Sequence, residues 1–211
     1  MCDAIILAGG GNTRIGKNKS LLSIENVPVI QRIVEAVETL VDRVILVLKR
    51  DNDNMKILNL LDGRVRFVFE NYAFMNPLAG MYIGLTHSTS EYSIVLPCDT
   101  PFIHKGIIKH MLNICDGFDL TIPRWDNEYL EPLCAVYRKK SVLKAIEKVE
   151  DLKDEKIRNI FNKLSKIKYV PIEDLRKFDR GLLTFFNINS LDDYKRALLI
   201  NKEFNKEGSQ H

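Results

Sequence analysis

Short apolar runs alternate with amphipathic stretches along the first half of the chain. The runs are continuous in Val, Ile, Leu or Phe, which is typical of strands that helices cover on both faces. They predict strands at 3–8, 43–48, 65–69 and 92–97. Helical spacing of apolar residues predicts helices at 29–40 and 55–61, and a further helix can begin just beyond Pro77. The alternation predicts an α/β fold with a Rossmann-like, mostly parallel sheet in a three-layer α/β/α arrangement.

The second half has a different pattern. Strands are predicted at 119–124 and 130–137, joined by a polar hairpin at 125–129, and again at 167–171 and 183–188. Amphipathic helices are expected to begin at Ser141 and Asp154, and Ser190 is expected to cap the last helix. The polar segment 205–211 is expected to be a disordered tail, so the domain spans residues 1–204.

Length and composition suit one domain. The chain has 211 residues, of which 45% are hydrophobic, enough to bury a sizeable core. A net charge of +3, from 31 cations and 28 acids, is too balanced for a nucleic-acid footprint, so we expect a small-molecule ligand. No apolar run approaches membrane-spanning length and no signal segment is evident, so we expect a cytoplasmic protein, monomeric or weakly oligomeric, without membrane partners.

The four cysteines do not form a recognisable framework. Cys2, Cys98, Cys115 and Cys134 are widely separated and contain no C-x-x-C spacing, so neither a zinc site nor a set of disulfides is indicated. Cys98 adjoins an aspartate at a strand end, but no histidine is spaced to activate it. We interpret Cys98 as a buried strand-end cysteine.

A glycine-rich stretch, 7–19, follows the first predicted strand. The three glycines at 9–11 let the backbone approach a ligand closely, so that several N–H groups can point at one anion. Arg14, Lys17 and Lys19 add positive charge to the same loop. A triphosphate would satisfy both features, and this interpretation is favoured over a glycine-rich turn with solvated cations.

Two familiar phosphate-binding loops do not fit this stretch. Residues 11–17 match G-x-x-x-x-G-K, but the P-loop then requires a Ser or Thr for Mg²⁺, and Asn18 stands there. The dinucleotide fingerprint fails because Arg14 occupies the position of its third glycine. A P-loop NTPase therefore remains only as a disfavoured alternative.

Several segments together resemble a known family. Residues 7–19 are similar to the signature L-A-G-G-x-x-x-R-M-G-x-x-K of nucleotidyltransferases that activate phosphorylated small molecules, with Ile15 replacing methionine. Four further segments, 76–81, 98–101, 131–137 and 186–193, resemble those of the molybdenum cofactor guanylyltransferases. The matches extend from Leu7 to Asp193 in the order of that family, and Asn76 replaces the first glycine of its G-P-L-A-G-I segment.

The resemblance implies a set of site residues. Those expected to bind the nucleotide are Leu7, Ala8, Gly9, Gly10, Lys19, Asn71 and Asp99. Those expected to act in catalysis, by placing charge on the phosphates, are Arg14, Lys19 and Asp99. Asp99 is the expected Mg²⁺ ligand, because Mg²⁺ binds through one or two carboxylates together with substrate phosphates. The alternative for Asp99 is a capping role at the next helix, since we expect His104 or Thr100 to cap it only poorly.

The acceptor is expected to contact the second half of the chain. Asn187 and Asn189 lie two residues apart in the predicted strand 183–188 and its end, so their amides would share one face and donate to a pterin or a phosphate. Trp125, the sole tryptophan, is a weaker candidate for stacking on a pterin ring.

Two departures from the family concern the base. Asn71 replaces a carboxylate, and Val47 replaces a polar residue near the end of the second strand. An amide both donates and accepts hydrogen bonds, whereas a carboxylate only accepts. GTP remains favoured over CTP, with looser discrimination, and an ordinary turn role for Asn71 is nearly as well supported.

The implied reaction is transfer of GMP from GTP to the phosphate of molybdopterin, with Mg²⁺ as cofactor and pyrophosphate released. The same chemistry with CTP, or with a sugar 1-phosphate as acceptor, stays open. A nucleotide-binding regulator without turnover stays open as well, because it would bind GTP and release no pyrophosphate.

Overall fold

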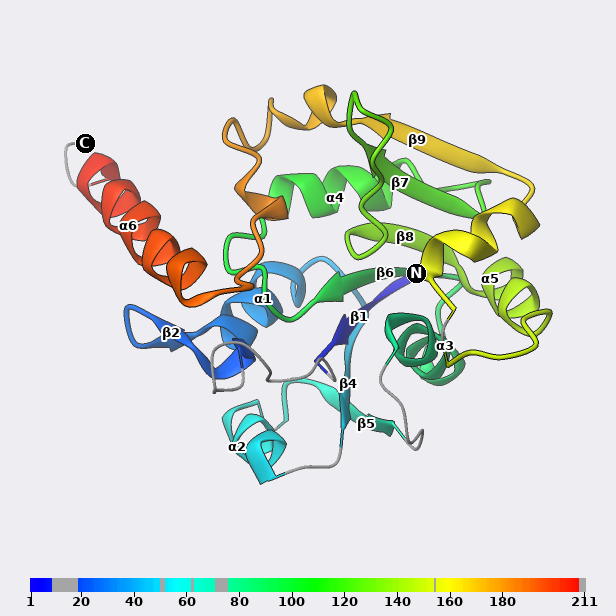
Figure 1. The fold of residues 1–211 in the computed structure, drawn as a ribbon, viewed down its shortest axis with the longest axis horizontal. Helices are drawn as coiled ribbons and strands as arrows, with labels where there is room; N and C mark the ends of the chain where they lie inside the picture. Colours follow the sequence, from blue (N-terminus) through cyan, green and yellow to red (C-terminus); the bar gives the residue numbers. More distant parts are fainter. Residues whose placement is uncertain (9–18, 50–51, 62, 71–75, 154, 209–211) are drawn as a thin grey trace.

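A seven-stranded sheet forms the centre of the described part of the protein (Figure 1). The computed structural model describes residues 1–8, 19–49, 52–61, 63–70, 76–153 and 155–208. In spatial order, the strands are β5 (Arg66–Glu70), β4 (Arg43–Lys49), β1 (Cys2–Leu7), β6 (Tyr92–Pro97), β8 (Ala135–Arg138), β7 (Leu120–Arg124) and β9 (Ile167–Pro171). Within the described residues β8 alone runs against the others, so the predicted mostly parallel sheet is confirmed.

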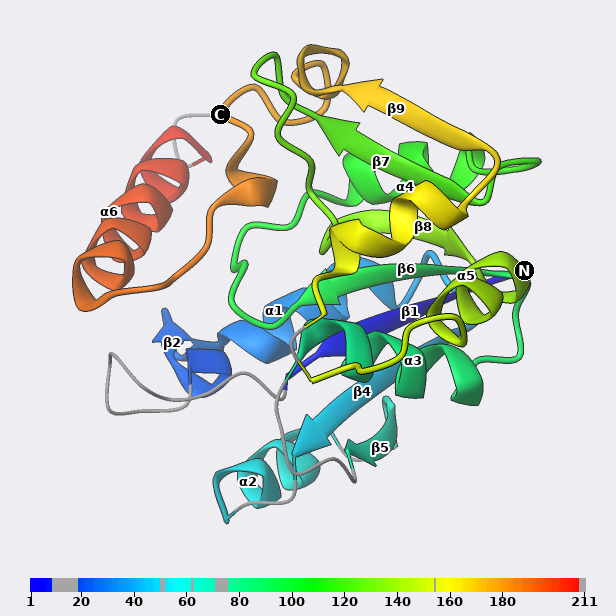
Figure 2. The ribbon, with the colours of Figure 1, turned by 45° about the vertical axis from the view of Figure 1, so that its right-hand side comes forward.

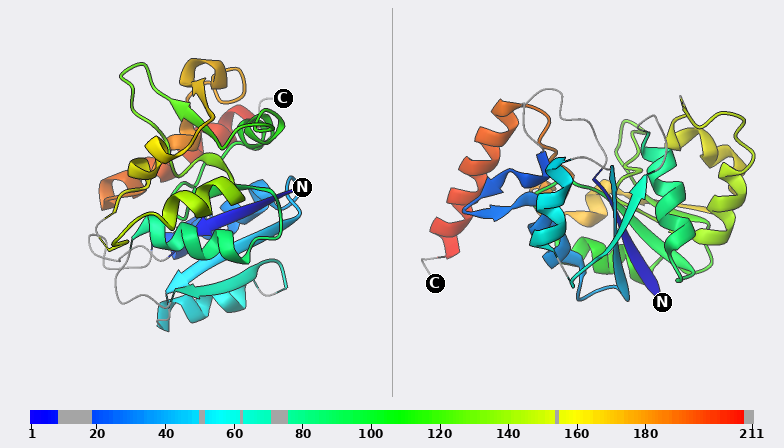
Figure 3. Two further views of the ribbon diagram at one scale, coloured as in Figure 1. Left: turned by 90° about the vertical axis from the view of Figure 1, so that its right-hand side faces the viewer. Right: turned by 90° about the horizontal axis from the view of Figure 1, so that it is seen from below.

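Helices cover both faces of this sheet, which confirms the predicted three layers (Figures 2 and 3). Side chains alternate along each strand, so Ile6 and Leu46 belong to one buried cluster and Ile5 and Ile45 to the other. The first cluster is completed by α1 (Val29–Val37), α2 (Asn52–Leu60) and α4 (Lys105–Asn113). The second is completed by α3 (Pro77–His87) and α5 (Lys139–Ile146).

A small two-stranded ribbon lies beside the main sheet and contacts the last helix. It consists of β2 (Ser23–Ile24) and β3 (Val27–Pro28), joined by a turn at residues 25–26, where both φ values are positive. The last helix, α6 (Leu191–Gly208), lies against it, and the Tyr194 hydroxyl donates to the Ser23 carbonyl at 2.6 Å (Figure 3). Ser190 caps α6 as predicted, because its hydroxyl accepts from the Asp193 N–H at 3.1 Å. The helix extends to Gly208, past residue 205, where we expected the tail to begin.

Three predicted elements differ from the structure. The predicted strand 183–188 is wrong: this segment contains a short 3-10 helix, η4 (Leu183–Phe185), is not a strand of the sheet, and bonds to Asp99 just beyond the carboxyl end of β6. The second hairpin strand is shorter than predicted, because residues 131–134 form a turn closed by a bond from Cys134 N to Glu131 O. The helix expected from Asp154 is a 3-10 helix, η2 (Ile157–Lys163). Among the described residues, no helix is long and apolar enough to cross a membrane.

A buried carboxylate, that of Asp119, joins the start of β7 to two other segments. Asp119 accepts hydrogen bonds from the Ser141 hydroxyl at the start of α5 and from the backbone N–H groups of Ser165 and Lys166, the last two at 2.9 and 3.0 Å. Burial alone would raise the pKa of Asp119, but these donors outweigh it and hold the pKa below its usual value. The ionised carboxylate therefore stabilises the fold.

We expect Asp119→Asn to lower the free energy of unfolding at pH 7 by about 1.5–3 kcal/mol, because the amide presents a donor to existing donors. A depressed native pKa contributes stability above the unfolded value of about 4, and this contribution is lost as the pH falls through the native value. Urea unfolding of the variant and wild type should therefore converge on acidification. The exposed Asp116→Asn is the control, and an equal loss in both variants would contradict this role.

Candidate active site

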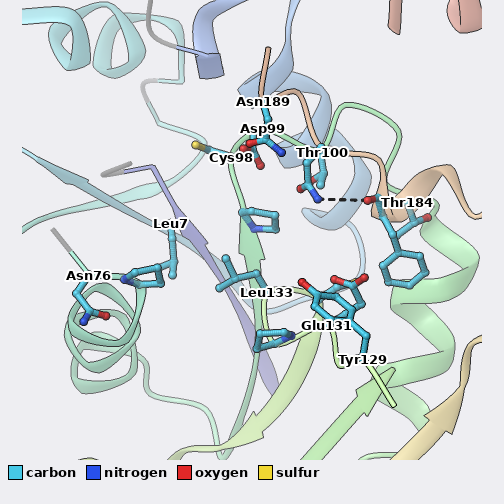
Figure 4. A pocket seen from close by; sticks show the side chains of 16 residues that line it. Leu7, Asn76, Cys98, Asp99, Thr100, Tyr129, Glu131, Leu133, Thr184 and Asn189 are labelled. Atoms are coloured by element: carbon cyan, nitrogen blue, oxygen red, sulfur yellow. Dashed lines mark hydrogen bonds between the residues drawn. The ribbon is translucent and has the colours of Figure 1, made fainter. Parts of the chain in front are cut away.

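A pocket lies where the carboxyl ends of β1 and β6 meet (Figure 4). These strands are neighbours in register, with Leu7 opposite Pro97, so the segment after β6 emerges beside the end of β1. The cavity has a volume of about 430 Å³. Its lining includes Leu7, Asn76, Cys98, Asp99, Thr100, Tyr129, Glu131, Leu133, Thr184, Phe185, Asn187 and Asn189.

A cation, a carboxylate and an amide meet at one end of this pocket. The Lys19 ammonium donates to the Asn189 side-chain oxygen at 3.0 Å and lies 3.7 Å from the Asp99 carboxylate. The Lys19 and Asp99 side chains are each 20% exposed, so both are largely shielded from water, and Asp99 and Asn189 line the cavity. Burial raises the pKa of Asp99, and the Lys19 charge opposes that rise. The sequence assigned Lys19 and Asp99 to one site without predicting a contact between them; the structure brings the two side chains together, and their roles toward a nucleotide stay predictions.

The segment that carries the two asparagines is fixed at both ends. The Ile188 N–H donates to the Asp99 carbonyl at 2.9 Å, which ties the segment to the end of β6. The Asp193 carboxylate accepts from the Asn189 N–H at 3.0 Å, which ties it to the start of α6. Asn187 and Asn189 both line the pocket, although the strand proposed to hold them does not form, and their contact with the acceptor stays a prediction.

Asp99 does not cap the next helix. The N-cap of α4 is His104, whose ring Nδ1 accepts from the Gly106 N–H at 3.1 Å. The expectation that His104 would cap poorly is wrong, because its ring folds back over the first turn in place of a shorter Asp or Ser side chain. The Asp99 carboxylate is left facing Lys19.

The predicted nucleotide-binding residues are only partly described. Leu7 lines the pocket, and the buried Ala8 donates its N–H to the Val47 carbonyl at 2.9 Å, which fixes the backbone where the glycine-rich loop begins. Val47 itself is fully buried in the core cluster beneath the α3 side of the sheet, so its side chain does not reach the pocket. Gly9, Gly10, Arg14 and Asn71 lie outside the described residues.

Cys98 lines the pocket without the properties of a nucleophile. Burial raises the pKa of its thiol to about 12, and the neighbouring Asp99 charge adds to the rise. A thiol with this pKa is protonated at neutral pH. In the described part of the chain, no three His, Cys, Asp or Glu side chains gather closely enough to hold a metal ion by themselves.

Comparison with known proteins shows which family this chain resembles. Residues 4–167 match the family of the MobA-like NTP transferase domain. A probable molybdenum cofactor guanylyltransferase of Methanosarcina mazei is 34% identical over 200 residues, covering 92% of this chain and 89% of the relative. A molybdenum cofactor guanylyltransferase of Desulfosudis oleivorans is 30% identical and covers 92% of each chain. The chain belongs to the MobA-like NTP transferase family.

Solved structures agree with this assignment. The chain is similar to the molybdopterin-guanine dinucleotide biosynthesis protein A of Archaeoglobus fulgidus, with a TM-score of 0.78, 28% identity and coverage of 95% of this chain and 99% of that chain. A nucleotidyl transferase of Methanothermobacter shares the fold, with a TM-score of 0.76 at 18% identity and coverage of 98% and 99%. As a MobA-like NTP transferase, the chain is a nucleotidyltransferase, and the P-loop NTPase and the regulator without turnover are set aside.

In this MobA-like NTP transferase, the sequence did not reveal the role of one pocket carboxylate. Glu131 lines the cavity, and its carboxylate accepts from the Trp125 indole N–H at 2.7 Å. Trp125 packs edge-on against Phe185, with ring centroids 5.9 Å apart, is partly buried against the core and does not line the cavity, so this geometry gives no support to its expected stacking on a ligand; its indole orients Glu131. The feature of the sequence that could have indicated this role is the E-P-L segment at 131–133, which begins with Glu131.

Asn76 is a second residue whose role the sequence did not show. Its side-chain oxygen accepts from the Leu78 N–H at 2.7 Å and caps α3, while its amide donates to the carbonyls of Leu152 and Glu155 at 2.8 and 2.6 Å. The glycine that the family pattern carries at this position has no side chain to make these bonds. Asn76 therefore fixes the start of α3, at the pocket wall, to the segment before η2.

Proposed function

We propose that this nucleotidyltransferase transfers GMP from GTP to the terminal phosphate of molybdopterin. The observation that carries the proposal is the convergence of Lys19, Asp99 and Asn189 at one end of a pocket between β1 and β6. The family assignment and the names of the relatives supply the substrate class. In the reaction, an oxygen of the acceptor phosphate attacks the α-phosphorus of GTP, the bond to the β-phosphate bridging oxygen breaks, and pyrophosphate leaves with that electron pair.

The protein's own groups would act by position and charge. Such a displacement needs little covalent work from the enzyme, so catalysis depends on alignment and on neutralising the charge that moves to the leaving group. We assign that charge to Lys19 and Arg14. The backbone of residues 7–10 would hold the nucleoside and phosphates, and Asn187 and Asn189 would hold the acceptor phosphate.

The donor set at Asp99 fits a magnesium ion. Mg²⁺ takes hard oxygen ligands, keeps several waters and commonly binds through one or two carboxylates plus substrate phosphates. Asp99 offers one such carboxylate facing the pocket, beside the amide oxygen of Asn189. When bound, Mg²⁺ would reduce the negative charge on the α-phosphate and the acceptor phosphate.

The direct test is to offer GTP and Mg²⁺ with molybdopterin and to measure pyrophosphate together with the guanylated product by mass spectrometry. ATP and CTP serve as alternative donors, and a sugar 1-phosphate as the alternative acceptor. We expect pyrophosphate release that requires molybdopterin and is fastest with GTP. Release with a sugar 1-phosphate alone would contradict the proposed acceptor.

The base preference can be tested at Asn71. The amide of Asn71 would place an NH₂ donor where the N1–H of guanine requires an acceptor, so Asn71→Asp is expected to raise the ratio of kcat/KM for GTP over CTP and ATP about 10-fold. Steady-state rates with the three nucleotides measure this ratio. If the ratio stays unchanged, or if the wild type prefers CTP, Asn71 does not contact the base and the cytidylyl transfer becomes the better assignment.

A further inference from the structure

The far end of the pocket has a chemistry different from the Lys19–Asp99 end. Figure 4 shows Asp99 and Asn189 together at one end, and Glu131 and Tyr129 together at the other, with Leu133 toward the side of Glu131. Phe185 also lines the cavity. This end therefore presents aromatic and aliphatic surface with one carboxylate, which suits a flat heterocycle better than a phosphate.

Glu131 is held by one hydrogen bond to its backbone and one to its side chain. The Glu131 backbone N–H donates to the Pro123 carbonyl at 3.1 Å, and the Trp125 indole N–H donates to the Glu131 Oε1 atom at 2.7 Å. Among the described residues, no Lys or Arg forms an ion pair with Glu131. Burial raises the pKa of the carboxyl group, and the Trp125 bond opposes the rise. Across the described segments, the Trp125 N–H is the one donor to this shielded carboxylate, which therefore retains acceptor capacity for a ligand, since two oxygens offer about four lone-pair sites.

We propose that Glu131 binds the 2-amino-4-oxopyrimidine edge of the acceptor's pterin ring, with Tyr129 and Phe185 beside the ring. This edge carries a ring N–H next to an amino group, two parallel donors that match the two oxygens of a carboxylate. The inference rests on the proposed function, because it takes the acceptor phosphate to lie at the Lys19–Asp99 end. Glu131 would then be a specificity-determining residue that distinguishes a pterin from rings without the amino group.

Guanine carries the same edge, so the position of Glu131 must decide between the two ligands. In the sheet, β8 and β7, which flank the hairpin of Glu131, lie on one side of β6, whereas β1 and β4 lie on the other. The nucleotide is assigned to the loop after β1. Glu131 therefore faces the acceptor side of the site.

The test compares ligands that differ only at this edge. Titration calorimetry would use 6-(hydroxymethyl)pterin phosphate and its lumazine counterpart, in which a carbonyl replaces the amino group. We expect wild type to bind the pterin ~10- to 100-fold more tightly, and Glu131→Gln to abolish this preference, because a charged hydrogen bond pair is lost. Glu128→Gln is the matched control: it lies in the same hairpin, pairs with Arg124 and does not line the cavity, so the preference should persist.

A second variant covers the case in which Glu131→Gln does not fold. Trp125→Phe keeps an aromatic ring against Phe185 and removes the N–H that orients Glu131, so we expect it to weaken the pterin preference several-fold. Equal binding of pterin and lumazine phosphates by wild type would overturn the inference. So would an unchanged preference in a folded Glu131→Gln.

Selectivity between nucleotides shows whether Glu131 recognises the pterin of the acceptor or the guanine of the nucleotide. ITP differs from GTP by lacking the 2-amino group, so the ratio of transfer rates with GTP and ITP reports on recognition of guanine. We expect Glu131→Gln to leave that ratio unchanged. A collapse of the GTP-to-ITP ratio would assign Glu131 to the nucleotide and overturn the inference. Failure of the proposed function would appear differently, as wild type that releases no pyrophosphate from GTP and molybdopterin.

Discussion

Replacing Lys19 by alanine is expected to lower nucleotidyl transfer ~100- to 1,000-fold, the usual effect of removing one group that stabilises developing charge. The ammonium lies 3.7 Å from Asp99 and 3.0 Å from the side-chain oxygen of Asn189, so its loss removes positive charge from the end of the pocket assigned to the phosphates. Because the benefit arises in the transition state, kcat should fall more than KM for GTP rises. Steady-state pyrophosphate release measures both constants.

The matched control is Lys140→Ala, which removes an exposed lysine from α5, away from the pocket. It should retain wild-type turnover. Lys19→Arg keeps the positive charge in a different shape and should recover part of the activity. A folded Lys19→Ala variant with nearly full turnover would show that Lys19 only pairs with its neighbours at the protein surface.

Much of the fold follows from local patterns in the sequence. The continuous apolar runs of the first half form β1, β4, β5 and β6, because strands covered on both faces need apolar residues at every position. The insertion of β8 between β6 and β7 was not predictable in this way, since strand order depends on contacts between distant segments.

The wrong strand at 183–188 shows where local pattern fails. Its apolar residues have strand-like spacing, but the chain is anchored by bonds that strands do not make: Thr184 donates both its N–H and its hydroxyl to Asp179 at 2.8 Å. The Thr184 oxygen in turn accepts from the His104 N–H at 3.1 Å. These contacts, with the bond from Ile188 to the Asp99 carbonyl, hold the segment beside the carboxyl end of β6, where Asn187 and Asn189 line the pocket.

The candidate site was predictable only where residues stand at strand ends. Asp99 lies just beyond the end of β6, after Cys98, so topology alone places it near the end of β1. Lys19 and Asn189 are 170 positions apart, and their contact depends on the path of the whole chain. The role of Glu131 could not be predicted, because it depends on the orientation of the Trp125 ring within a packed hairpin.

The Asp99→Asn variant distinguishes a catalytic role of Asp99 from a role in stabilising the fold. The amide keeps the shape of the side chain and removes the charge, so transfer is expected to fall ~100-fold or more, and the Mg²⁺ concentration for half-maximal rate should rise. Burial raises the pKa of Asp99, which means that the folded protein disfavours the ionised form relative to the unfolded chain. Removing that charge at pH 7 should therefore leave the melting temperature unchanged or slightly higher.

Two measurements test Asp99→Asn: magnesium titration of pyrophosphate release, and thermal unfolding. The control variant is Asp126→Asn, which replaces an exposed carboxylate in the 125–129 hairpin. The control variant should match wild type in both measurements. If Asp99→Asn instead melts at a lower temperature and keeps the wild-type Mg²⁺ dependence, then Asp99 supports the fold and the metal ligand lies elsewhere. His104 caps α4, so such a loss of stability would not come from a helix cap at Asp99. The combination of low activity, raised Mg²⁺ requirement and retained stability is expected only if the carboxylate was placed for the substrate's phosphates.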